Sequence, residues 1–147
     1  MEQPLLALDH VRMDFQSRGG LLKKRATVRA VDDVTLRLDE GEILAVVGES
    51  GCGKTTLGRM VVGLLHPTAG TIRFRGADVR TLRGDAYAAY RRGVQMVHQD
   101  SYAALNPART IFQSLSVPLL HHKLVDSKAA ARERLEELLT LVGLVPP

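Results

Sequence analysis

The chain has 147 residues, of which 45% are hydrophobic, 24% charged and 4% aromatic, with a formal net charge of +4. These values fit one ordinary globular domain and exclude collagen-like, low-complexity and disordered chains, and the mild positive charge gives no reason to expect nucleic-acid binding. Its apolar runs are far shorter than the about 20 residues of a membrane span. The amino terminus has no secretory signal pattern, and the single cysteine, Cys52, fits a reducing compartment.

The amino-terminal part of the chain predicts strands. Residues 5–15 and 28–38 have strand patterns, and the second alternates apolar and polar residues, so one side of it faces solvent. The polar, glycine-bearing stretch 16–27 between them is a loop or an insertion. After a turn at 39–42, residues 43–47 form a continuous, partly β-branched apolar run, which is typical of a strand buried on both faces in a parallel sheet.

The rest of the chain predicts mainly helices. Residues 54–65 have helical apolar spacing and end at a Pro- and Gly-containing turn, and 71–75 and 94–97 are predicted short strands. A helix is predicted over 110–121, interrupted by Pro118, and a last one begins after the N-cap Ser127 and ends at Gly143. The order of elements is that of a mixed α/β fold. The apolar stripe of the last helix, predicted to be core, consists of Leu135, Leu138, Leu139 and Val142.

Residues 48–55 match the phosphate-binding pattern G-x-x-x-x-G-K-[ST] in full, between a predicted buried strand and a predicted helix. Glycines let the backbone come close to a ligand, so that N–H groups surround phosphates at the positive end of the helix. Lys54 supplies a charge to the phosphates and Thr55 a hydroxyl to Mg²⁺. The candidate nucleotide-binding residues here are Gly48, Glu49, Ser50, Gly51, Cys52, Gly53, Lys54, Thr55 and Thr56.

The sequence over 30–76 strongly resembles the ATP-binding subunits of ABC transporters, and VQMVHQDSYAALNPARTI over 94–111 resembles the glutamine-loop region of that family. The segment GGLLKKRATVRAV together with ALNP is similar, more narrowly, to the dipeptide/oligopeptide and nickel importer branch. His98 and Ser101 stand where that branch commonly has Phe and Pro.

This resemblance implies an α/β fold that has a P-loop NTPase core, an antiparallel β subdomain and part of a helical subdomain. It places the β subdomain at 1–42, the phosphate-binding core up to the glutamine loop at 43–100, and the start of the helical subdomain at 101–147. ATP and Mg²⁺ are the implied cofactors. The implied partners are transmembrane permease subunits and a second ATPase subunit at the cytoplasmic face of the cell membrane, where ATP binding and hydrolysis drive uptake of peptides or a related small solute.

The resemblance also assigns residues outside the glycine-rich loop. Gln99 corresponds to the glutamine that reaches Mg²⁺ and the attacking water and senses the membrane subunits, so Thr55 and Gln99 are the expected Mg²⁺ ligands. Phe15 is the candidate for stacking on adenine if 16–27 is an insertion. The spacing of shorter family members instead puts this position near Arg25, whose guanidinium also stacks on a base.

Three family features do not occur in the 147 residues: a signature resembling LSGGQ, an apolar strand ending in Asp-Glu, and a switch histidine. The sequence ends about where the signature would begin. We therefore expect an amino-terminal portion, truncated before the signature motif, that holds binding residues and no catalytic residue of its own.

Two other functions stay open at this point. One is a nucleotide-binding module that does not hydrolyse ATP. The other is a small P-loop kinase, which is less favoured because it does not explain Gln99 and the ALNP that follows it. A GTPase is excluded, since Asn106 is the only asparagine and is followed by proline, so no guanine-reading Asn-Lys-x-Asp exists.

Overall fold

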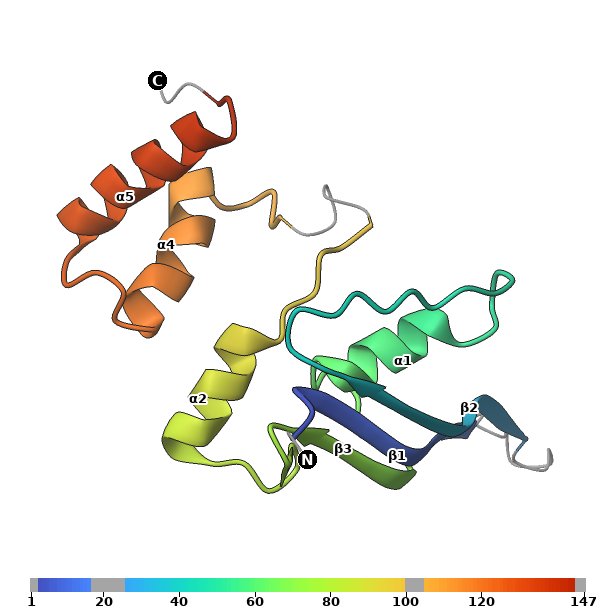
Figure 1. Cartoon of the computed structure of the whole chain (residues 1–147). Helices are drawn as coiled ribbons and strands as arrows, with labels where there is room; N and C mark the ends of the chain where they lie inside the picture. The colour runs from blue at the N-terminus through green and yellow to red at the C-terminus, as the bar shows by residue number, and fades with distance from the viewer. Residues whose placement is uncertain (1–2, 17–25, 100–104, 145–147) are drawn as a thin grey trace. The chain divides into compact units, whose positions relative to one another are not determined.

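The computed structural model describes residues 3–16, 26–99 and 105–144. They belong to two compact units, Met1–Met96 and Val97–Pro147. The first unit is built on an antiparallel four-stranded sheet with the order β2-β1-β3-β4 (Figure 1). Its strands are β1 (Leu6–Gln16), β2 (Thr27–Leu38), β3 (Ala69–Phe74) and the two-residue β4 (Ala77–Asp78). The strands β1, β2 and β3 confirm the strands predicted over 5–15, 28–38 and 71–75.

Alternating apolar residues of β1 form the centre of the core. Leu8 and Val11 are fully buried, and β1 pairs with β2 on one side and β3 on the other, so its inner face is covered along its length. Helix α1 (Lys54–Val61) packs Leu57 and Met60 against this core, and helix α2 (Gly84–Gly93) adds Tyr90. Helix α1 confirms the predicted helix over a shorter range, whereas α2 was not predicted.

Two predicted strands are wrong. Residues 43–47 have no regular secondary structure, and Ile43 and Val47 are 96% and 87% exposed. Residues 94–97 are likewise not a strand. An apolar, β-branched run becomes a strand only when a neighbouring strand satisfies its backbone N–H and C=O groups. In the described part of the chain, neither segment pairs with the sheet.

The second unit contains a helical pair, α4 (Ile111–His121) and α5 (Lys128–Leu141). Helix α4 continues through Pro118 instead of being interrupted there, and a capping box fixes its start, in which Thr110 and Gln113 exchange side chain-to-backbone hydrogen bonds. Ser127 caps α5 by accepting a hydrogen bond from the Ala130 N–H at 3.1 Å, as predicted.

The apolar stripe of α5 is only partly core. Leu135 is buried, Leu138 and Leu139 are half-buried, and Val142 is exposed. Gly143, which has a left-handed φ of 79°, directly follows the C-cap Val142, so the helix ends at the predicted place. Among the described helices of both units, none has the length and apolar character required to cross a bilayer.

Candidate phosphate-binding site

The glycine-rich loop enters α1 at Gly53, which is the N-cap of that helix and has a left-handed φ of 100°. A Cβ at this position would lie 2.1 Å from the Ala30 carbonyl oxygen, so only glycine lets the loop lie against the backbone of β2. No side chain caps the helix. The first N–H groups of an α-helix have no partner within the helix, so the first turn of α1 presents free donors at its positive end.

The Lys54 side chain folds back over the loop. Its Nζ donates hydrogen bonds to the carbonyl oxygens of Gly48 and Glu49, both at 2.6 Å, and lies 3.4 Å from the Cys52 Sγ. The ammonium therefore lies against the backbone of the loop, next to the start of α1. A fixed cation beside uncapped helix N–H groups is the arrangement that binds a phosphate group.

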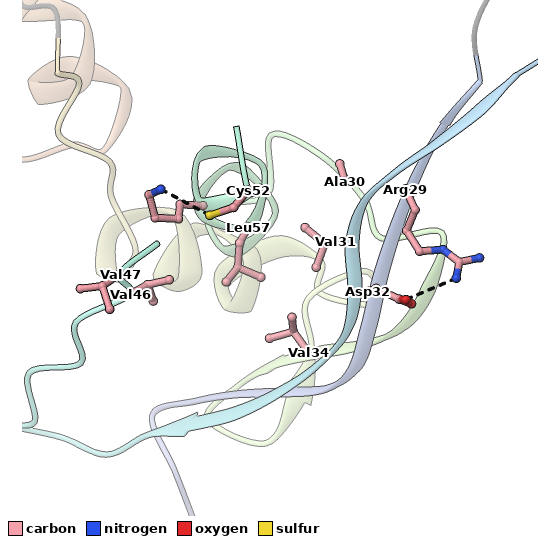
Figure 2. Close-up of a pocket in the computed structure, with 11 residues that line it drawn as sticks. Arg29, Ala30, Val31, Asp32, Val34, Val46, Val47, Cys52 and Leu57 are labelled. Carbon is pink, nitrogen blue, oxygen red and sulfur yellow. Dashed lines mark hydrogen bonds and ion pairs between the residues drawn. The ribbon is translucent and has the colours of Figure 1, made fainter. Parts of the chain in front are cut away.

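A cavity of about 400 Å³ adjoins the loop, between β2, the segment 43–47 and α1. Figure 2 shows Val46 on one side and Val31 of β2 on the other, with Leu57 of α1 between them. Two charged residues at its β2 wall form an ion pair, in which Arg29 Nη1 lies 3.3 Å from Asp32 Oδ2. The cavity thus has mostly apolar walls and reaches Cys52, Gly53 and Lys54 of the loop.

The residues present fit a Mg²⁺ ion that is bound together with phosphates. Thr55 is exposed in the first turn of α1, where its hydroxyl is an oxygen ligand of the kind that Mg²⁺ prefers. Within the described residues, no group of three or more His, Cys, Asp or Glu side chains could hold a metal ion. Mg²⁺ in nucleotide sites takes few protein ligands and completes its shell with waters and phosphate oxygens, so the absence of such a cluster is compatible with Mg²⁺ bound together with a nucleotide.

The structure does not bring the other predicted site residues together with this loop in one unit's cavity. Phe15 is on β1 opposite Val28, is 40% exposed and does not line the cavity. Arg25 lies outside the described residues. Gln99 is exposed and belongs to the second compact unit, whereas the loop belongs to the first. The roles of Phe15, Arg25 and Gln99 stay predictions.

Sequence reasoning missed the contribution of β2 to the site. Ala30, Val31 and Val34 form a wall of the cavity, and Ala30 fixes the position of Gly53. The glycine-rich pattern gives no sign of these contacts, because they join residues more than 20 positions apart in the sequence. The only available signal was the alternation in β2, which indicated that one face of this strand packs inside.

Residues 31–146 match the family model described as ABC transporter. The chain is 39% identical to the oligopeptide transport ATP-binding protein OppF of Escherichia coli over 97% of its own length and 43% of that protein. It is 42% identical to the nickel import ATP-binding protein NikE of Pseudomonas putida, over 95% of its own length and 50% of that protein. The chain therefore spans about half the length of the curated relatives that it matches.

Solved structures share the fold. The ATP-binding cassette MJ0796, in a dimeric post-hydrolysis state bound to ADP and Pi, matches with a TM-score of 0.71 and 24% identity, over 95% of this chain and 57% of that one. At this identity the match concerns the fold alone. It confirms the ABC cassette fold for the matched part, with the α/β class and the antiparallel sheet that the sequence predicted.

Proposed function

Because the chain belongs to the ABC transporter family, we propose that it is the ATP-binding part of an importer ATPase that takes up peptides or a related small solute. The uncapped start of α1, with the Lys54 ammonium held beside it, is the observation that carries this proposal. Two of its relatives are named for oligopeptide transport and nickel import, and these names support peptides or a related small solute as the transported class.

We assign the nucleotide contacts as follows. The loop 48–53 and the first N–H groups of α1 bind phosphate oxygens, Lys54 neutralises the terminal phosphates, and Thr55 binds Mg²⁺. Phe15 or Arg25 stacks on the adenine, and Gln99 is the second Mg²⁺ ligand. The proposed division is a β subdomain over 1–42, a phosphate-binding core over 43–100 and the start of a helical subdomain over 101–147.

We further propose that the complete protein is longer and works at the cytoplasmic face of the cell membrane, on two permease subunits and with a second ATPase subunit. The dimeric state of MJ0796 supports the pairing of two ATPase subunits. The relatives are about twice as long as this chain. Strands from that remaining half are our proposed neighbours for the exposed run 43–47.

Mg·ATP should protect Cys52 from modification. Cys52 is exposed, is the only cysteine of the chain and lies 3.4 Å from the ammonium of Lys54, so maleimide should label it readily when the loop binds no nucleotide. A phosphate chain on the loop would cover the thiol. Labelling rates followed by mass spectrometry, with and without Mg·ATP, test this directly.

Two variants make the labelling experiment specific. Cys52→Ser should give no label at all, which shows that the signal comes from this residue. Lys54→Ala should be labelled at the same rate with and without nucleotide, at concentrations that protect the wild type. Equal labelling of the wild type under both conditions would show that Cys52 does not border an occupied phosphate site, and the proposed function would be wrong.

Replacing Gln99 by alanine should uncouple hydrolysis from transport in the protein assembled with its permease subunits. Gln99 is exposed and lies outside the phosphate-binding loop, so ATP binding should change little while ATP-driven uptake falls. Uptake into proteoliposomes and phosphate release are measured on the same preparation. Gln95→Ala, four residues earlier, is the matched control and should behave as wild type. Normal uptake and hydrolysis in Gln99→Ala would contradict the coupling role.

A further inference from the structure

The carboxyl-terminal end of α1 is held by side chains of α2. A helix leaves its last four carbonyl groups without partners inside the helix. The first two of these in α1 accept hydrogen bonds from the chain that follows, in a Schellman-type turn at Gly63, whose φ is 73°. These bonds are Leu64 N to Arg59 O at 2.8 Å and Gly63 N to Met60 O at 3.0 Å.

The next two carbonyl groups, those of Val61 and Val62, accept hydrogen bonds from side chains of α2. The Tyr90 hydroxyl donates to the Val61 oxygen at 2.5 Å, and Nη1 of Arg91 donates to the Val62 oxygen at 2.6 Å. The Arg91 charge also faces the negative end of the α1 dipole. Every carbonyl at this end of the helix therefore has a partner, and two adjacent residues of α2 supply the last two.

The Tyr90 ring has little freedom to move. It is 1% exposed and its centroid lies 5.5 Å from that of Phe74 on β3. A Cβ on Gly63 would lie 3.1 Å from the Tyr90 oxygen, so the ring packs closely against this glycine. Burial raises the pKa of the Tyr90 phenol, so the hydroxyl keeps its proton and stays a hydrogen-bond donor near neutral pH.

Arg91 differs from the solvated arginine that its sequence context suggests. Its neighbour Arg92 is exposed, whereas Arg91 is half-buried. Among the described residues, no carboxylate forms an ion pair with Arg91, and the guanidinium binds a backbone carbonyl instead. The Arg91 side chain is thus held by a hydrogen bond to one atom, the Val62 carbonyl oxygen, and such a bond has a preferred direction.

We propose that Tyr90 and Arg91 are positioning residues for the phosphate-binding helix: by fixing the carboxyl-terminal end of α1, they hold Lys54 and Thr55 at its other end. Helix α1 has eight residues and is about 12 Å long, so it moves as one piece. The apolar contacts of Leu57 and Met60 keep it on the sheet but are not directional. The two hydrogen bonds from α2 set its rotation and its position along its axis.

This inference rests on the proposed function, and it is tested by nucleotide titration of the 147-residue chain. The variants are Tyr90→Phe, which removes only the hydroxyl, Arg91→Gln, and the pair together. Their matched controls on the same helix are Tyr87→Phe and Arg92→Gln, at exposed positions. A fluorescent ATP analogue and the corresponding AMP analogue are titrated at a temperature at which circular dichroism shows every variant folded.

The double variant should bind the ATP analogue roughly tenfold more weakly, with a smaller change for the AMP analogue, and the controls should match wild type. In a Lys54→Ala background the same double variant should cause a smaller further loss, because the helix then has Thr55 but no ammonium to position. Arg91→Lys should partly restore binding relative to Arg91→Gln. A purely structural role would lower the melting temperature and leave the ratio of the ATP to AMP affinities unchanged.

Two results would overturn the inference alone, and two others would overturn the proposed function together with it. Wild-type affinity in the folded double variant, or an equal loss in the Lys54→Ala background, would overturn the positioning role and leave the ATP site intact. If Tyr90→Phe does not fold, the affinity of Arg91→Gln alone tests the positioning role. Arg91 is only half-buried, so its replacement should leave the chain folded. Failure of the wild type to bind ATP, or insensitivity to Lys54→Ala, would overturn the proposed function and the inference with it.

Discussion

Replacing Lys54 by alanine should weaken the binding of Mg·ATP by about 2–3 kcal/mol, which is about 30- to 150-fold in the dissociation constant. The residue Lys54 is half-buried, and its ammonium is held by two carbonyl oxygens beside the start of α1, so its charge is ready at the place where phosphates would bind. Alanine keeps the helix and removes the cation. Titration with a fluorescent ATP analogue measures the difference.

The control for this variant is Lys128→Ala, which removes a lysine at the first position of helix α5 in the second unit. It lowers the net charge by the same amount and should leave the affinity unchanged. Circular dichroism must show that the Lys54→Ala chain is folded. A folded Lys54→Ala chain that binds ATP as tightly as the wild type would mean that the loop 48–53 is not a phosphate site.

The parts of the fold that the sequence predicts are those fixed by local chemistry. Helix α1 begins at Lys54 because Gly53 adopts a left-handed conformation that ends the loop, and α5 begins after Ser127 because a serine hydroxyl there accepts an N–H of the first turn. The strands β1 and β2 follow from apolar alternation, since one of their faces is buried. Each of these signals lies within a few residues of the element it predicts.

The parts that the sequence mispredicts depend on distant partners. The run 43–47 has the composition of a buried strand, but composition cannot supply the neighbouring strand that makes it one. Helix α2 was missed for the opposite reason. It is short, has glycine at both ends and carries arginines, so its one buried anchor, Tyr90, gives no visible period.

In the candidate site, too, the local features can be predicted from the sequence and the long-range contacts cannot. The chemical groups of the loop can be predicted because a glycine pattern followed by lysine and threonine has a direct physical reason. The groups that hold this loop in place cannot be predicted in this way. Ala30 contacts Gly53 from 23 positions away in the sequence, and Tyr90 contacts Val61 from 29 positions away. Only the folded chain shows that β2 and α2 support the two ends of α1.

The 147 residues on their own should release phosphate from ATP at no more than the background rate. Catalysis of phosphoryl transfer comes almost entirely from positioned groups and charge stabilisation. The carboxylates and the signature motif that the family resemblance assigns to these tasks do not occur in this sequence. The exposed apolar run at 43–47 and the open sheet edges should in addition make the isolated chain marginally stable and prone to association.

Steady-state phosphate release by the purified chain tests this expectation, with Lys54→Ala as the control for contaminating ATPases and size-exclusion chromatography for association. Equal rates for the two chains support it. Turnover well above background that depends on Lys54, from a monomer that unfolds cooperatively, would contradict it. A catalytic carboxylate would then have to be sought among Asp78, Asp85 and Asp100. Of these, Asp78 is a poor candidate for a base, because its hydrogen bonds with Arg80 lower its pKa.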